Sequence, residues 1–258
     1  MENSLELEVL HVVSHEAKTY VSNISGVAQT LSRFYERGEL DKCDVEKNLS
    51  MILANCTKIQ RLMNNIVDLS AENTAAMMLD AVYVDMVAFC DSLCELSEAE
   101  MGGAAEITFK TDCDSLYVYC DILKMERVLL NLISNSVKYT RNACRILIEL
   151  GGNDDEWWFC VSDNGIGISE DMREKVFLPF VRHIAENVPT RNGTGLGLAI
   201  VDKFIRIHSG EVKIKDSELG GCRFDIHIPR NNGNMIKLKE VSTAPKPSQD
   251  AVKQELDI

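Results

Sequence analysis

The sequence lacks long apolar runs, basic excess and close cysteine pairs, and each absence excludes a class of protein. No segment approaches the ~20 consecutive apolar residues that a transmembrane helix needs. The 258 residues include 27 Lys+Arg against 40 Asp+Glu, a net charge of −13. This balance argues against nucleic acid or an anionic membrane as the main partner. The nine cysteines form no CxxC pair, so neither a disulfide framework nor a zinc site is indicated.

The first residues lack the features of a secretory leader. Met1 is followed by Glu2, Glu6 and Glu8 and not by a basic and then an apolar segment. We therefore expect a reduced, cytoplasmic protein. The hydrophobic share of 45% is sufficient for folded cores, and the length suits one large domain or two modest ones.

The first seventy residues have the apolar periodicity of packed helices. Apolar side chains recur at alternating spacings of three and four residues, from Leu10 to Phe34 and again from Val45 to Ile66. This seam, interrupted by a polar turn near Gly38, predicts an antiparallel helical hairpin. Because one hairpin cannot enclose a core, we expect a homodimer with a four-helix bundle. The alternative is a hairpin that packs on the rest of its own chain.

The remainder alternates short strands with helices, which predicts an α+β domain with helices on one face of a mixed sheet. After Arg230 the chain turns polar and loses periodicity, which predicts a disordered tail. The predicted organisation is a hairpin over 1–71, a linker over 72–82, an α/β sandwich over 83–230 and a tail over 231–258.

One predicted helix of the second domain carries polar residues suited to a polyphosphate. Asn131, Asn135, Lys138 and Tyr139 share the face opposite its apolar side. Amide oxygens beside an ammonium suit a magnesium-bound phosphate chain, because the carbonyl coordinates the hard cation while lysine faces the phosphate. An ordinary amphipathic helix with a polar outer side would show the same pattern.

A second segment, Asp163-Asn164-Gly165-Ile166-Gly167, directly follows an apolar strand. Its glycines let the backbone approach a flat ligand, and the aspartate has the chemistry to accept a hydrogen bond from an exocyclic amine. By itself the segment is only a strand-to-turn pattern.

A third segment, Gly193-Thr194-Gly195-Leu196-Gly197, opens an apolar helix. Free N–H groups at a helix start make an anion site. The GxGxG spacing, with no leading strand of a βαβ unit, fits a Rossmann dinucleotide site poorly.

The order and separation of these segments resemble the ATP-binding domain of sensor histidine kinases, relatives of the gyrase, MutL and Hsp90 proteins. That resemblance spans residues 80–230. The run Ser14-His15-Glu16-Ala17-Lys18-Thr19 resembles the phosphoacceptor box of the same kinases. In the heptad frame His15 lies farthest from the seam, where an exposed neutral imidazole can act as a nucleophile. The other histidines are expected to be ordinary solvated side chains: His11, His183, His208 and His227.

The resemblance implies a role for each matching residue. His15 accepts the γ-phosphoryl group of ATP, and Glu16 takes or orients the imidazole proton. Asn135 binds Mg²⁺, and Asp163 reads the adenine. Phe177 and Phe180 anchor an ATP lid over Val181–Asn192. The implied nucleotide contacts also include Asn131, Lys138, Tyr139, Gly165, Gly167, Phe180, Arg182, Arg191, Gly193, Thr194, Gly195, Leu196 and Gly197.

The resemblance also implies a partner and a second activity. The phosphoryl group would pass to an aspartate of a response regulator, and Thr19 would orient the water that hydrolyses the regulator's aspartyl phosphate. The family usually has proline soon after this threonine, whereas here Tyr20 follows it. Because proline bends helices, we expect an uninterrupted first helix.

Two other functions stay open at this point. A hydrolytic ATPase clamp of the gyrase type would carry Glu one turn before the magnesium asparagine, where this chain has Asn131. A degenerate kinase used as a phosphorelay scaffold would fail to bind ATP.

Overall fold

The computed structural model describes residues 2–39, 41–70, 79–141, 143–181, 194–230 and 246–256. The chain divides into two compact units, Met1–Val67 and Asp68–Leu256. This division falls slightly before the end predicted for the hairpin, within its second helix. Among the described residues, no helix has both the length and the apolar character needed to cross a membrane.

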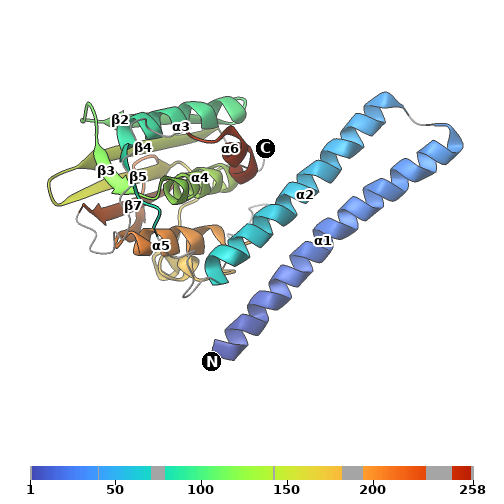
Figure 1. Ribbon diagram of the computed structural model, residues 1–258, viewed down its shortest axis with the longest axis horizontal. Coiled ribbons are helices and arrows are strands. Elements are labelled where there is room, and N and C mark those ends of the chain that lie inside the picture. The colour runs from blue at the N-terminus through green and yellow to red at the C-terminus, as the bar shows by residue number, and fades with distance from the viewer. Residues whose placement is uncertain are drawn as a thin grey trace. The chain divides into compact units, whose positions relative to one another are not determined.

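The first unit is the predicted helical hairpin, formed by α1 (Glu2–Arg37) and α2 (Lys42–Ser70), as Figure 1 shows. Along α1 the predicted seam residues are half-buried, among them Val13, Ala17 and Tyr20, while most residues between them are exposed. The helix runs through Tyr20 without a break, which confirms the expectation drawn from the missing proline.

The second unit contains a five-stranded mixed sheet in the order β2-β4-β5-β7-β6. Only the β2–β4 pairing is parallel. A separate antiparallel pair joins β1 and β3. The strands are β1 (Val82–Asp85), β2 (Ala105–Thr111), β3 (Tyr117–Cys120), β4 (Cys144–Gly152), β5 (Glu156–Asp163), β6 (Glu211–Asp216) and β7 (Cys222–Pro229).

Three helices pack on the sheet: α3 (Met86–Glu100), α4 (Ile122–Tyr139) and α5 (Gly197–Ile207). Alternate residues of the strands form the core with them, including Ile146 and Ile148 of β4 and Trp157 and Phe159 of β5, each at most 1% exposed. Helices packed on a mixed sheet are the predicted α+β architecture.

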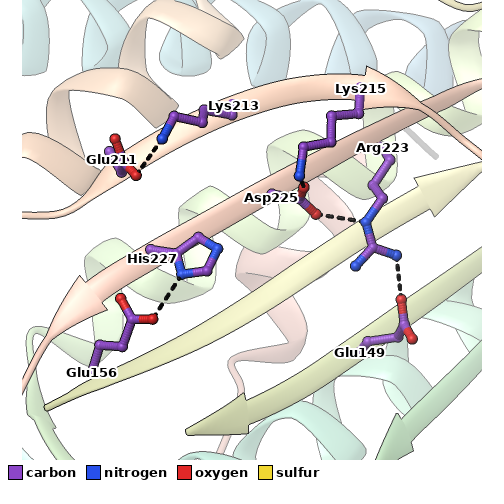
Figure 2. A network of polar contacts seen from close by, with 8 residues as sticks. All are labelled: Glu149, Glu156, Glu211, Lys213, Lys215, Arg223, Asp225 and His227. Atoms are coloured by element: carbon purple, nitrogen blue, oxygen red, sulfur yellow. Dashed lines mark hydrogen bonds and ion pairs between the residues drawn. The ribbon is translucent and has the colours of Figure 1, made fainter.

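The intervening residues of the strands carry a network of charged side chains (Figure 2). Arg223 on β7 donates to Asp225 and Glu149, and Lys215 on β6 pairs with Asp225 at 2.6 Å. Burial alone would raise the pKa of Asp225, but hydrogen bonds from Lys215, Cys160 and Arg223 lower it overall. These cross-strand pairs therefore tie β4, β7 and β6 together on this face.

The end of the chain contradicts the prediction of a disordered tail. Residues 249–256 form a helix, α6 (Gln249–Leu256), which packs on α3 and α4 and buries Val252 completely. Ser248 caps it, because its hydroxyl accepts from the N–H of Ala251. The segment is too short to show a clear helical period in the sequence, and residues 231–245 lie outside the described part.

His208 contradicts the expectation of a solvated histidine, because it is completely buried at the end of α5. Its Nε2 accepts from the backbone N–H of Asp121 at 3.0 Å, and its Nδ1 lies 2.7 Å from the carbonyl of Phe204, to which it donates. Burial lowers the pKa of His208, so the ring stays neutral. The residue therefore fastens the C-terminal end of α5 to the N-terminal end of α4.

Replacing His208 with alanine should lower the free energy of unfolding by about 2–4 kcal/mol, since the variant leaves a cavity and an unpaired buried N–H group.

The folded-state pKa of His208 lies below the unfolded value of about 6.5, so the unfolded chain binds more protons as the pH falls through that value. His208 therefore makes wild type lose stability below about pH 6.5. Calorimetric unfolding between pH 5 and 7.5 should show a weaker acid slope in His208→Gln, and equal slopes would contradict this assignment.

Candidate nucleotide-binding site

Asp163, at the end of β5, is the centre of the site and is 6% exposed. One carboxylate oxygen accepts the backbone N–H groups of Gly165 at 2.8 Å and Cys222 at 3.0 Å. The other lies 3.2 Å from the hydroxyl of Ser136 on α4. Burial raises the pKa of Asp163, and these hydrogen bonds partly offset that effect. The carboxylate is thus held in one orientation by three different segments.

The turn before β7 supports this carboxylate, a contribution that the sequence motifs did not reveal. A Cβ on Gly221 would lie only 2.1 Å from the Asp163 carboxylate, so this position accommodates glycine alone. Gly221 also donates its N–H to the carbonyl of Asp163 at 3.1 Å. The adjacent pair Gly220-Gly221 was the available signal in the sequence.

Asn164 has a structural role within the same segment. Its side chain donates to the carbonyl of Ala143 and accepts from the N–H of Arg145, so it continues the pairing of β4 beyond β5. Next to it Gly165 passes close to α4, because a Cβ there would lie 3.0 Å from the carbonyl of Tyr139. Gly167 has φ +72°, which glycine adopts without strain.

Asn131 joins α4 to the start of α5. Its amide nitrogen donates to the carbonyl of Arg127 at 2.8 Å, which turns its oxygen toward Gly197. A Cβ on Gly197 would lie 2.7 Å from that oxygen, so glycine is required for this approach. Two predicted segments, the asparagine helix and the glycine-rich helix start, are therefore brought into contact.

The residues that flank the predicted lid are hydrogen-bonded to each other. The N–H of Phe180 donates to the carbonyl of Gly195 at 2.9 Å, and a Cβ on Gly195 would lie 2.9 Å from the Phe180 backbone. Phe180 itself has φ +65°, an uncommon conformation for a residue with a side chain. The N–H of Leu196 donates to the hydroxyl of Thr194 at 3.3 Å, and the Leu196 side chain is fully buried.

Of the remaining predicted nucleotide contacts, some lie on α4 and others lie outside the described residues. Asn135, Lys138 and Tyr139 are half-buried on α4, on the helix that carries Asn131. Three predicted phosphate contacts lie outside the described residues: Arg182, Arg191 and Gly193.

The predicted phosphoacceptor residues lie in the first unit. His15 is exposed and Glu16 is half-buried on α1, as the heptad position of the histidine predicts. The hydroxyl of Thr19 donates to the backbone carbonyl of His15 at 2.9 Å, one helical turn away.

A buried carboxylate beside a glycine turn, an asparagine helix and a glycine-rich helix start together define an ATP-binding domain. Residues 120–232 match the family described as histidine kinase-, DNA gyrase B- and HSP90-like ATPases. Histidine kinase P4 of Formosa agariphila is 27% identical over 99% of this chain and 19% of its own length. The autoinducer 2 sensor kinase/phosphatase LuxQ of Vibrio parahaemolyticus is 28% identical over 95% of this chain and 28% of its own.

The fold agrees over both units. The crystal structure of histidine kinase ThkA in complex with response regulator TrrA matches with a TM-score of 0.66 and 23% identity, covering 89% of this chain and 63% of that one. Both units thus resemble those of sensor histidine kinases, a helical hairpin followed by an ATP-binding domain. The chain spans only 19% and 28% of the length of these two curated relatives.

Proposed function

We propose that this chain transfers the γ-phosphoryl group of ATP to His15. The observation that carries the proposal is an exposed histidine, followed by Glu16, on an unbroken helix of the chain that holds the Asp163 site. An imidazole nitrogen attacks the γ-phosphorus, the bond to the β–γ bridging oxygen breaks, and ADP leaves. Glu16 takes or orients the proton on the other ring nitrogen.

The second unit would hold the nucleotide through residues with distinct tasks. Asp163 would accept from the adenine amine, and the backbone N–H groups of Gly195 and Gly197 would face the phosphates. Asn135 would bind Mg²⁺ together with phosphate oxygens, a ligand set typical of this ion. When bound, Mg²⁺ neutralises charge that develops on the phosphates. Lys138 and Tyr139 are half-buried on the helix of Asn135 and would contact the same ligand, while Asn131, buried against Gly197, would line the site.

Asn131 favours phosphotransfer over the hydrolytic clamp mechanism. A clamp ATPase uses a carboxylate one turn before the magnesium ligand to activate water. Here an amide occupies that position, and its nitrogen donates to the carbonyl of Arg127. An amide cannot act as a general base, so water is not activated from this residue.

The test is autophosphorylation of the purified chain with γ-labelled ATP and Mg²⁺. Label on a histidine supports the proposal. Failure to bind ATP favours the scaffold function, and release of free phosphate without label on the protein favours the hydrolytic ATPase.

A response regulator is the proposed next acceptor, in agreement with the complex named for ThkA. Thr19 would then position water for dephosphorylation, since a neutral hydroxyl is sufficient for that task. We expect Thr19→Ala to lose most phosphatase activity and to retain most autophosphorylation, while Thr19→Ser retains both. The measurement is the decay of purified phospho-regulator with ADP and Mg²⁺. Equal decay in wild type and Thr19→Ala would leave the kinase proposal intact and remove this role.

The hairpin is proposed to form a homodimer, because it exposes more apolar surface than an isolated hairpin tolerates. Leu53 is 66% exposed and Met63 48%, and Val21 and Leu49 are similarly exposed. Light scattering should give about twice the chain mass of 28.9 kDa. Leu53→Glu should yield monomer, whereas Leu123→Glu, at a 68% exposed leucine of α4, should not. A wild-type monomer at micromolar concentration would contradict the proposal.

A further inference from the structure

Two contacts fasten the end of α2 to the helices of the nucleotide site. Arg127 on α4 donates to the carboxylate of Asp68, and Lys203 on α5 donates to the carbonyl of Leu69 at 3.0 Å. Asp68 and Leu69 belong to the second unit, although they are the last turn of the hairpin helix. The hairpin's final residues are therefore part of the catalytic unit.

The far side of the linker is fastened as well. The N–H of Asp80 donates to the carboxylate of Asp121, the N-cap residue of α4, at 3.2 Å. Both ends of the segment between Leu69 and Asp80 are thus attached to the same unit.

Basic residues are needed at this helix end for a physical reason. The last carbonyls of a helix have no intrahelical partners and carry partial negative charge, which cations stabilise. The last turn of α2 contains no basic residue of its own. Arg127 and Lys203 supply that charge from α4 and α5.

Arg127 is suited to this task because its guanidinium is held from several sides. The guanidinium carbon of Arg127 lies 5.5 Å from the centroid of the Phe204 ring. The Nε of Arg127 lies 3.6 Å from the carboxylate of Glu255 on α6. The arginine side chain is 22% exposed and that of Asp68 is 25% exposed. A pair this shielded from water is stronger than an ordinary surface ion pair.

We propose that Arg127 is a positioning residue for phosphoryl transfer, which clamps the last turn of α2 to α4 and so fixes the point, at Val67 and Asp68, where the hairpin joins the catalytic unit. This inference rests on the proposed function. The clamp shortens the connection between the nucleotide site and the phosphoacceptor hairpin. If residues 68–80 were free, they would form a flexible tether of about 20 Å r.m.s. length, which would dilute the nucleotide relative to His15.

The first test is the kinetics of autophosphorylation. Arg127→Gln and Asp68→Asn should each lower the maximal rate by about tenfold, because the effective concentration falls with tether length. The affinity for a non-hydrolysable ATP analogue should stay within about twofold. Arg127→Lys, which keeps the charge, should restore most of the rate. A loss of nucleotide affinity equal to the loss of rate would overturn the positioning role.

Two further variants separate the clamp from general stability. The double variant Arg127→Gln/Asp68→Asn should be no slower than either single variant, because each removes the same contact. Glu255→Gln, which changes the partner of Arg127 on α6 and leaves Asp68 in place, should retain the wild-type rate within about twofold. Additive losses in the double variant would overturn the proposed clamping of α2 by Arg127. A loss of rate in Glu255→Gln as large as that in Arg127→Gln would overturn it as well.

A measurement without ATP tests the clamp independently of the kinase activity. Hydrogen exchange of the peptide that contains Asp68–Ser70 should be faster in Arg127→Gln than in wild type, and Arg127→Lys should resemble wild type. Unchanged exchange would overturn the clamp even if activity is present. If wild type fails to label His15 while exchange responds as expected, the clamp stands and the proposed kinase reaction fails.

Discussion

Autophosphorylation should disappear in His15→Gln, because glutamine fills similar space but has no nucleophilic ring nitrogen. ATP binding should remain at the wild-type level, since Asp163, Asn131 and Gly197 lie in the other unit. The label on wild type should be acid-labile and base-stable, as expected for a phosphorus–nitrogen bond. The measurement is incorporation of γ-labelled phosphate, with calorimetry of ATP binding in parallel.

His227→Gln is the matched control for this result. His227 is a half-buried histidine of the second unit, and it pairs with Glu156 on the sheet at 3.3 Å. It should label at the wild-type rate. Acid-stable label, or equal labelling of His15→Gln and wild type, would refute His15 as the phosphoacceptor.

Asp163→Asn should weaken ATP binding by one to two orders of magnitude without unfolding the domain. Asparagine keeps an oxygen for the N–H groups of Gly165 and Cys222, so the local backbone remains supported. What is lost is a charge-assisted hydrogen bond to the adenine amine, a loss of about 1.5–3 kcal/mol, or roughly tenfold to over a hundredfold in Kd. Calorimetric titration with ATP measures the change directly.

Asn135→Ala provides the comparison, because its loss of ATP affinity should depend on Mg²⁺. Its affinity should fall only when Mg²⁺ is present, whereas Asp163→Asn should bind poorly in both conditions. Normal ATP–Mg²⁺ binding in both variants would remove this site assignment. Because burial raises the pKa of Asp163, wild-type affinity should also decline on acidification at a higher pH than an exposed aspartate would allow.

Much of this protein is specified by local patterns. The heptad seam is sufficient to predict the hairpin and the exposure of His15, because the period of apolar residues determines which helix face is buried. The absence of proline after Thr19 is likewise sufficient to predict a continuous α1, since only a local backbone hydrogen bond is involved. Short motifs are also sufficient to select Asp163, Asn135 and Gly195 as candidate site residues, because each motif needs a specific residue type at a specific spacing.

The tertiary structure decided what depends on contacts between distant segments. Sequence patterns gave no sign that His208 is buried against Asp121, that Gly221 makes room for the Asp163 carboxylate, or that Arg127 reaches Asp68. Each of these pairs lies more than fifty residues apart, so no periodicity or motif relates its members. The short helix α6 was missed for a related reason, because eight residues are too few to form a stable helix alone and burial of Val252 in its packing on α3 and α4 stabilises it.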